Sequence, residues 1–336
     1  MKIAIELHGS TSHGPWSPTR GEGRWAQNVA AVLATMGHDV YLFGTSGEWG
    51  TCPRIQNLIV CHYDDVIGLA DVDVLFDAAM WVGKPLLVKS RVVLRGYFSF
   101  GQEYFTEPWP ENHWFLCPYP WVMAAADVPA NPVRDRTALL PYVLPPRDWW
   151  PRRENDWSPK SSAKRGAALL PTRESFCTPI VAAYADALLD HLRRAAVDVA
   201  VLHRHKYAEA GRLEAIDGFD VYESLPCGQL LDLLSETKLV CNLPVWGGVA
   251  MEAPLHGACP LAWSDQPVFA EVTAGIDPSL VLPADRSDVP AMISAITRLW
   301  ADDDLRDRLM AAYREALRFA TVDAFKDQWR ALEKRL

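Results

Sequence analysis

Two adjacent glycines and a nearby glutamate form the stretch of this sequence that is best suited to chemistry. Gly247 and Gly248 follow a short apolar segment that ends at Asn242, and Glu252 comes one helical turn after the second glycine. Glycine lets a backbone approach a ligand closely, and the N–H groups at the start of a helix favour an anion. A carboxylate one turn into that helix can accept hydrogen bonds from sugar hydroxyl groups. The stretch therefore predicts a site for a nucleotide diphosphate.

The elements around these residues are those of a parallel sheet. Residues 239–242 form an apolar run that predicts a strand buried on both faces, and a helix is expected over residues 249–256, ended by Gly257. A second strand is expected over residues 260–263. Ligands of open α/β sheets bind where the carboxyl end of a strand meets the next helix. An ordinary strand–helix–strand unit without a ligand shares these elements, so the glycines and Glu252 are what indicate binding.

The order of residues in this segment resembles the donor-binding motif of retaining GT-B glycosyltransferases of the glycosyltransferase family 4 type. The matching residues are Gly247, Glu252, Ala253, Gly257, Pro260, Glu271 and Val272. The resemblance implies that Glu252 holds the ribose of a nucleotide donor. The family also has an acid that contacts the donor sugar, and Pro244 stands in its place here. Backbone N–H groups from Val245, Trp246, Gly247 and Gly248 are therefore expected to hold the sugar hydroxyls.

The beginning of the chain has a similar organisation. A strand is expected over residues 2–7, a helix over about 23–36 and a strand over 40–43. Gly21, Arg24, Asn28, Gly37, His38 and Val40 fit the opening of the same family, in which a glycine-rich loop meets the donor phosphates. The resemblance implies phosphate contacts for Gly21 and Arg24. A nucleotide-binding Rossmann domain of another kind would have much the same pattern.

Two further loops complete the donor site that the resemblance implies. The strand expected over residues 167–170 leads to Arg173, where the family carries cations that neutralise the diphosphate leaving group. Arg173 is accordingly expected to act in catalysis together with Glu252. A loop containing Ser224 and Leu225 lies where the family holds the nucleotide base.

Other residues that could bind a metal do not form a convincing site. Asp71 and Asp73 form a D-x-D, but they lie where a strand begins, whereas catalytic groups in open α/β sheets gather where strands end. Asp77, at the end of that strand, is the better functional candidate, with a solvated or capping role expected first. His203 and His205 would share one face if the strand over residues 199–202 continued, yet no third ligand lies nearby. No metal site is predicted.

Composition narrows the class of protein. The chain has 336 residues, 49% hydrophobic and 22% charged, which suits a globular protein with two cores. A net charge of −9 argues against a nucleic-acid partner held by overall electrostatics. Seven scattered cysteines without a C-x-x-C pair indicate a reducing compartment and no structural zinc. No apolar run is long enough for a membrane span, so a cytoplasmic protein is expected.

The fold that the resemblance implies is α/β of the GT-B type, with two doubly wound Rossmann-like domains facing a cleft. Residues 1–145 would form the acceptor domain, 146–165 a linker, 166–318 the nucleotide-sugar donor domain, and 319–336 a helix crossing back to the first domain. The linker is locally basic. It is expected to be a solvated connection, and contact with an anionic acceptor, lipid head group or nucleic acid is the alternative.

The expected function is transfer of a sugar from a nucleotide diphosphate sugar to an acceptor hydroxyl, with retention of anomeric configuration and without a metal or other cofactor. The acceptor is left open among a glycan, a lipid, a small molecule and a modified nucleic acid. Two alternatives remain. Pro244 also suits a catalytically silent relative that binds a nucleotide or glycan, and a nucleotide-sugar epimerase has the same two-domain fold.

Overall fold

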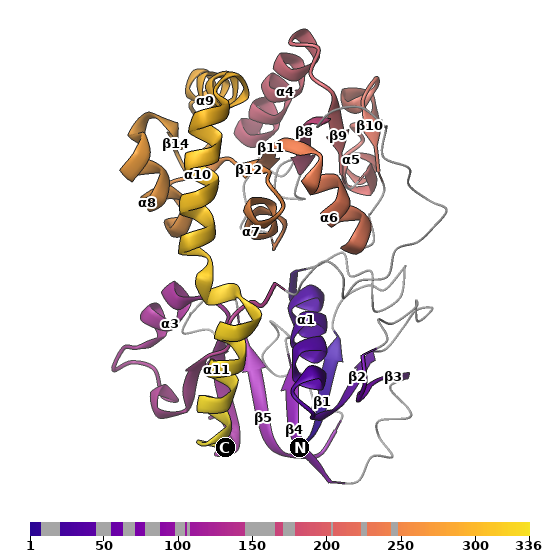
Figure 1. The fold of residues 1–336 in the computed structure, drawn as a ribbon, viewed down its shortest axis with the longest axis vertical. Coiled ribbons are helices and arrows are strands. Elements are labelled where there is room, and N and C mark those ends of the chain that lie inside the picture. Colours follow the sequence, from indigo (N-terminus) through magenta and orange to yellow (C-terminus); the bar gives the residue numbers. More distant parts are fainter. Residues whose placement is uncertain are drawn as a thin grey trace. The chain divides into compact units, whose positions relative to one another are not determined.

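The chain divides into two compact units (Figure 1): unit 1 comprises residues 1–151 with 318–336, and unit 2 comprises residues 152–317. A computed structural model describes residues 1–7, 21–44, 55–62, 71–77, 88–97, 105, 108–144, 165–170, 179–202, 204–222, 227–242 and 248–336. Among these residues, no helix combines the length and the apolar character that crossing a bilayer requires.

Unit 1 is built on a parallel sheet with the strand order β3-β2-β1-β4-β5-β6-β7. Its strands are β1 Lys2–Leu7, β2 Asp39–Gly44, β3 Leu58–His62, β4 Val72–Asp77, β5 Ser90–Gly96, β6 His113–Cys117 and β7 Thr137–Leu139. The order reverses between β1 and β4, which makes that pair the switch point at which open α/β sheets bind ligands.

Helix α1, Gly21–Thr35, is enclosed within unit 1, because every residue from Trp25 to Ala34 is buried. Trp25 lies edge-on against Phe76 of β4, with ring centroids 5.1 Å apart. Gly37 ends the turn after the helix with φ +88°, a conformation that glycine adopts without steric cost. The predicted opening of strand, helix and strand is thus present, with α1 beginning two residues earlier than expected.

Gly96 of β5 is the point at which α1 and the sheet approach most tightly. A Cβ built on Gly96 would lie 2.3 Å from the ring of Trp25, which is itself fully buried. Gly96→Ala is expected to lower the free energy of unfolding by about 1–3 kcal/mol, because a packed ring must move. Urea unfolding of this variant beside Gly275→Ala, whose added Cβ meets nothing within 4 Å, measures the effect. Equal stability of the two variants would show that Trp25 relaxes freely.

The end of the chain belongs to unit 1. Helix α11, Val322–Glu333, packs against α1 on the same side of the sheet (Figure 1). The indole Nε1 of Trp329 donates a 3.0 Å hydrogen bond to Nε2 of His38, and both side chains are buried. Burial, with help from the nearby N-terminal ammonium, lowers the pKa of His38, which keeps this imidazole neutral and able to accept the bond.

Unit 2 contains a second parallel sheet, with the order β10-β9-β8-β11-β12. Its strands are β8 Arg165–Leu170, β9 Val199–Val201, β10 Asp220–Val221, β11 Thr237–Asn242 and β12 Cys259–Pro260. The order reverses between β8 and β11, whose last residues Leu170 and Asn242 lie opposite each other in register. The carboxyl ends of these two strands therefore form the switch point of unit 2.

The helices of unit 2 cover this sheet. They include α4 Pro179–Arg194, α5 Arg204–Glu209, α6 Cys227–Ser235, α7 Gly248–Leu255, α8 Pro267–Ile276, α9 Val289–Ala301 and α10 Asp303–Ala316. Helix α10 begins after Asp302, whose side chain accepts the backbone N–H of Leu305 at 2.8 Å. Such an N-cap satisfies one of the free donors at the start of a helix.

The single strand predicted over residues 260–263 is wrong in its detail. The chain forms β12 to Pro260 and then β13, Ala262–Trp263, which pairs with β14, Val281–Leu282, in a separate two-stranded sheet. The break falls at Leu261, whose N–H is shared between the carbonyl of Val240 and the side chain of Asn242, each at 3.2 Å. A side chain at the end of β11 thus interrupts the regular ladder.

Candidate active site

The glycine segment that the sequence singles out lies at the switch point of unit 2. Helix α7 begins at Gly248, and β11 ends at Asn242 beside the end of β8. The loop between them lies outside the described residues, so the positions of Val245, Trp246 and Gly247 are not given by the structure. The described chain has a helix N-terminus after β11, one of the two strands at the switch point of a parallel sheet, and such a position is the usual place for a phosphate.

Glu252 is buried within α7, with 4% of its surface exposed. The helix is otherwise apolar, and it packs against α6, α10 and β12. Removing a carboxylate from water costs free energy unless hydrogen bonds or charges compensate. Burial of Glu252 therefore requires a compensating interaction, and its role in binding hydroxyl groups stays a prediction.

The C-terminal end of α7 is fixed so that Glu252 keeps its place. Gly257 has φ +87°, and the N–H of Ala258 bonds the carbonyl of Ala253 at 2.9 Å, which is the closure expected when glycine ends a helix. The Nε of Arg314, on α10, donates to the carbonyl of Pro254 at 2.8 Å. Two independent contacts thus hold the turn that follows Glu252.

Trp263 packs beside the end of β11, a position that the sequence did not indicate. Its indole Nε1 donates to the carbonyl of Asn242 at 2.8 Å, and its ring centroid lies 5.7 Å from that of Tyr184 on α4. The guanidinium carbon of Arg286 lies 4.6 Å from the same ring, and Arg286 pairs with Asp265 at 2.9 Å. The signal available in the sequence was an asparagine at the end of a buried strand, a position normally apolar.

The other predicted donor-site residues are only partly described. Gly21 is the first residue of α1 and Arg24 lies in its first turn, so both are at the helix N-terminus next to the switch point of unit 1. The side chain of Arg24 is outside the described part. Arg173, Ser224 and Leu225 lie outside the described residues, as does most of the basic segment over residues 146–165.

Three ionisable residues form a row across the carboxyl ends of the unit 1 strands. The register pairs Glu6 of β1 with Asp77 of β4, and Asp77 with Arg95 of β5. All three are buried, Glu6 and Asp77 at 2% exposure and Arg95 at 8%. The solvated role expected for Asp77 is therefore wrong, because its side chain is enclosed within the unit. Each of these residues closes an apolar strand segment in the sequence, a shared pattern that the prediction overlooked.

Asp73 of the D-x-D has an ordinary structural position, and His203 lies outside the described residues. Asp73 accepts a 2.8 Å hydrogen bond from the backbone N–H of Lys2, at the amino end of the strands. His205 lies in helix α5, so the proposed continuation of β9 with His203 and His205 on one strand face is wrong. Among the described residues, no group of three or more histidine, cysteine, aspartate or glutamate side chains could hold a metal.

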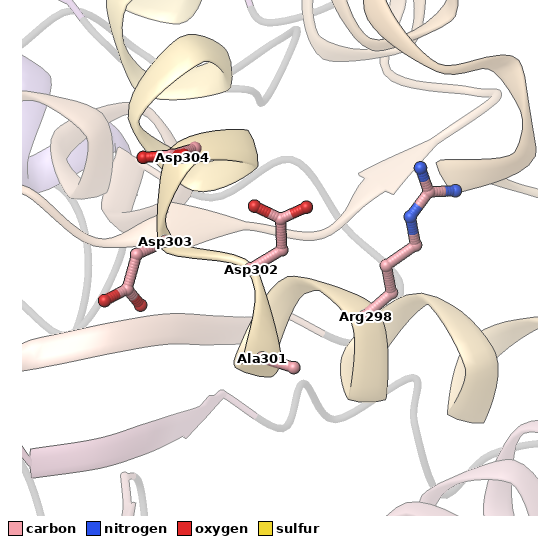
Figure 2. Close-up of a pocket in the computed structure, with 5 residues that line it drawn as sticks. All are labelled: Arg298, Ala301, Asp302, Asp303 and Asp304. Carbon is pink, nitrogen blue, oxygen red and sulfur yellow. The ribbon is translucent and has the colours of Figure 1, made fainter.

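An open pocket of about 510 Å³ lies elsewhere in unit 2, at the turn between α9 and α10. It is lined by Arg298, Ala301, Asp302, Asp303 and Asp304 (Figure 2). The side chain of Asp303 points away from those of Arg298 and Asp302 in that view. Asp302 caps α10, Arg298 pairs with Asp277 at 2.5 Å, and Asp303 pairs with Arg306. These charges serve the local structure, and the pocket is not a candidate for the chemistry.

Comparison with known proteins yields matches to structures alone: no family model and no curated protein matches the sequence. Sucrose-phosphate synthase from Thermosynechococcus elongatus superimposes with a TM-score of 0.64 at 13% identity, over 100% of this chain and 99% of that chain. An alpha-glucosyltransferase in complex with UDP superimposes with a TM-score of 0.59 at 12% identity, over 99% of this chain and 100% of that chain. The fold is GT-B. The predicted fold class is thereby confirmed.

A third similar structure has a different kind of activity in its name. A UDP-N-acetylglucosamine 2-epimerase described as putative, from Listeria monocytogenes, gives a TM-score of 0.56 at 11% identity, over 93% of this chain and 91% of that chain. At identities this low the likeness concerns the GT-B fold alone. The activity has to be argued from the site.

Proposed function

We propose that this protein is a glycosyltransferase that moves a sugar from a nucleotide diphosphate sugar to an acceptor hydroxyl, with retention of anomeric configuration. The observation that carries the proposal is the buried Glu252 on α7, a helix that begins at Gly248 next to the switch point of a GT-B unit. A helix N-terminus and a buried carboxylate at this place suit a diphosphate and a ribose, respectively.

Each residue of the proposed donor site has a role set by its chemistry. The N-terminus of α7, with Gly247 and Gly248, presents N–H groups and a positive dipole end to the phosphates. Arg173 and Arg24 supply positive charge to the same group, and Glu252 accepts hydrogen bonds from the ribose hydroxyls. Ser224 and Leu225 hold the base through their backbone. Val245 and Trp246 offer backbone N–H groups to the donor sugar, where Pro244 leaves no acid.

The reaction needs charge stabilisation more than a strong base. Positive charge develops on the sugar ring while negative charge grows on the leaving diphosphate. Donors already in position around the phosphates lower this barrier, because they need no rearrangement as the charge appears. The acceptor hydroxyl attacks from a bound position, which removes the entropy cost of bringing two molecules together. Because Arg173 and a helix dipole are proposed to stabilise the phosphates, the reaction is expected to proceed without a metal.

Binding of the free nucleotide tests the donor site. The melting temperature of the protein is measured with UDP, GDP, ADP, dTDP and CMP, each with and without EDTA. One nucleoside diphosphate is expected to stabilise the protein by about 2.7 kcal/mol at a hundred times its dissociation constant, and EDTA should not change the shift. Stabilisation by none of the five contradicts the proposal, and a shift abolished by EDTA contradicts metal independence.

An epimerase is the second candidate, because a structure named for that activity shares the fold. The two reactions differ in their need for an acceptor. Incubating the protein with the nucleotide sugar selected by the binding experiment, without any acceptor, distinguishes them by nuclear magnetic resonance of the sugar. A change of configuration at one ring carbon indicates an epimerase. Transfer that requires an added acceptor indicates the transferase, and nucleotide binding without either reaction indicates a catalytically silent relative.

A further inference from the structure

Arg95 occupies an unusual position for a charged side chain. It is the penultimate residue of β5, at the carboxyl ends of the unit 1 strands, and it belongs to the row that contains Asp77 and Glu6. Neighbouring strands lie about 4.8 Å apart, so the row is compact. Ligands of open α/β sheets bind outside this edge. The register therefore places the backbone of Arg95 at the edge of the sheet where ligands of this fold class bind.

Arg95 is buried, and no residue in the described part of the chain forms an ion pair with it. Only 8% of the residue is exposed, and its Nε has no hydrogen-bond acceptor in the described part of the chain. No described carboxylate comes within ion-pair distance, although Asp77 is its neighbour on the next strand. Removing a cation from water without a paired anion is costly, and buried charges are normally paired. An arginine left in this state is suited to an anion that arrives from outside.

The aromatic surroundings of Arg95 would strengthen its attraction to an anion. The ring of Trp109 lies 5.9 Å from its guanidinium carbon, a cation–π contact that offsets part of the burial. The rings of Tyr97 and Phe115 stack with centroids 4.9 Å apart. The ring centroids of Phe105 and Trp109 are 5.4 Å apart. These aromatic rings exclude water, so the attraction between the guanidinium and an anion is less screened than at the surface.

The charge of Arg95 acts on a neighbouring histidine, His113. Burial and then the charges of Arg95 and Arg136 lower the pKa of His113 to about 4, and the opposing effect of Asp77 is smaller. His113 is the first residue of β6, the neighbour of β5, and its ring centroid lies 6.2 Å from that of Trp109. The imidazole is therefore neutral near pH 7, and its pKa is sensitive to the charge of Arg95.

We propose that Arg95 binds an anionic group of the acceptor, a phosphate or a carboxylate, at the carboxyl ends of the unit 1 strands. The proposal rests on the glycosyltransferase function, since it names the chemical class of acceptor. The planar fork of arginine matches both groups through two parallel N–H···O bonds. The acceptor is accordingly a phosphorylated or acidic molecule that also offers a hydroxyl, and a neutral sugar binds poorly.

Calorimetric titration of the whole protein tests the site. Inorganic phosphate, glucose 6-phosphate and glucuronate are compared with glucose, on the wild type and on three variants. Arg95→Gln is expected to weaken binding of the preferred anion by about 10- to 100-fold, the range for a charge-assisted hydrogen bond. Arg95→Lys keeps the charge but not the planar fork, so its affinity for the anion should lie between those of Arg95→Gln and the wild type. Arg91→Gln changes an exposed arginine of the same strand and should bind as the wild type does.

A spectroscopic measurement on the wild type makes the test independent of whether the variants fold. An anion on Arg95 offsets the charge that depresses the pKa of His113, so that pKa should rise from about 4 when phosphate or the preferred anion is added. Titration of the His113 ring signal, assigned by its loss in His113→Gln, measures the rise. Phosphate bound elsewhere leaves this signal unchanged.

The outcomes separate this proposal from the proposed function. Anion binding that Arg95→Gln abolishes, or a raised pKa of His113, supports the anion site. Equal binding by Arg95→Gln and wild type, or an unchanged pKa of His113 at saturating anion, overturns it. The melting-temperature shift with the donor nucleotide is measured on the same variant. If the nucleotide still raises the melting temperature but no anion binds at Arg95, the proposed transferase function stands and the anion site is rejected. If an anion binds at Arg95 but no nucleotide raises the melting temperature, the transferase function is rejected.

Discussion

Replacing Trp329 by alanine is expected to lower the free energy of unfolding of unit 1 by about 3–5 kcal/mol, the cost of deleting a large buried aromatic side chain. Only 1% of Trp329 is exposed. The change also leaves Nε2 of His38 without its indole donor in a buried site. Both losses weaken the contact of α11 with the rest of unit 1, and no compensating contact is available to a methyl group.

The measurement is urea unfolding followed by circular dichroism, with hydrogen exchange of the β1 amides as a local readout. Gln328→Ala, an exposed change next to Trp329 on the same helix, is the matched control and should lie within about 0.5 kcal/mol of wild type. Trp329→Phe keeps most of the apolar contact and removes only the donor, so a smaller loss is expected. If Trp329→Ala and Gln328→Ala had the same urea midpoint of unfolding, α11 would contribute little to the stability of unit 1.

Replacing Glu252 by glutamine is expected to reduce kcat/KM about 10- to 100-fold for the nucleotide sugar, because a charged acceptor of ribose hydroxyl bonds becomes neutral. The side chain keeps its size, so the packing of α7 is retained. The larger part of the change should appear in KM, since ribose binding is made in the ground state as well as in the transition state.

Steady-state kinetics on this variant are compared with those of Glu315→Gln, an exposed glutamate of α10 in the same unit. The control should have wild-type kinetics. Turnover of the Glu252 variant at the wild-type rate and KM would show that the ribose is held by other groups. A loss of the nucleotide's melting-temperature shift in parallel with the rise in KM would place the effect in donor binding.

The parts of the fold that depend on local chemistry could be predicted from the sequence. Gly37 and Gly257 mark the ends of α1 and α7 because only glycine adopts their positive φ angles readily. The apolar runs of β1 and β11 indicate strands buried on both faces, and both form. The order of these elements, together with the resemblance, was sufficient for the GT-B fold class, which the structural comparisons confirm.

Features that depend on contacts between distant residues could not be predicted. The break between β12 and β13 arises from the side chain of Asn242, which competes for the N–H of Leu261 across two strands. Residues 204–209 form a helix although they follow a strand directly, so the alternating pattern around His205 was misleading. No local pattern distinguishes such cases, because the deciding partner lies elsewhere in the sequence.

The candidate site was predictable only where a residue type is rare in its setting. Glu252 stands out because a charged residue interrupts an apolar helix, and it is indeed buried. Arg95 does not stand out alone, since arginines commonly follow a strand. Its burial depends on packing with residues distant in the sequence, among them Trp109, whose ring lies 5.9 Å from the guanidinium carbon. The row with Asp77 and Glu6 required the register of three strands.

The membership of residues 318–336 in unit 1 has a consequence for biosynthesis. A ribosome makes residues 1–151 first, but the helix that shields His38 emerges only after all of unit 2 has been translated. At ordinary elongation rates that interval is on the order of ten seconds. Unit 2 can fold as soon as its last residue is free, whereas the nascent unit 1 must wait with the face intended for α11 exposed. The order of translation is thus the reverse of the order in which the two units are completed.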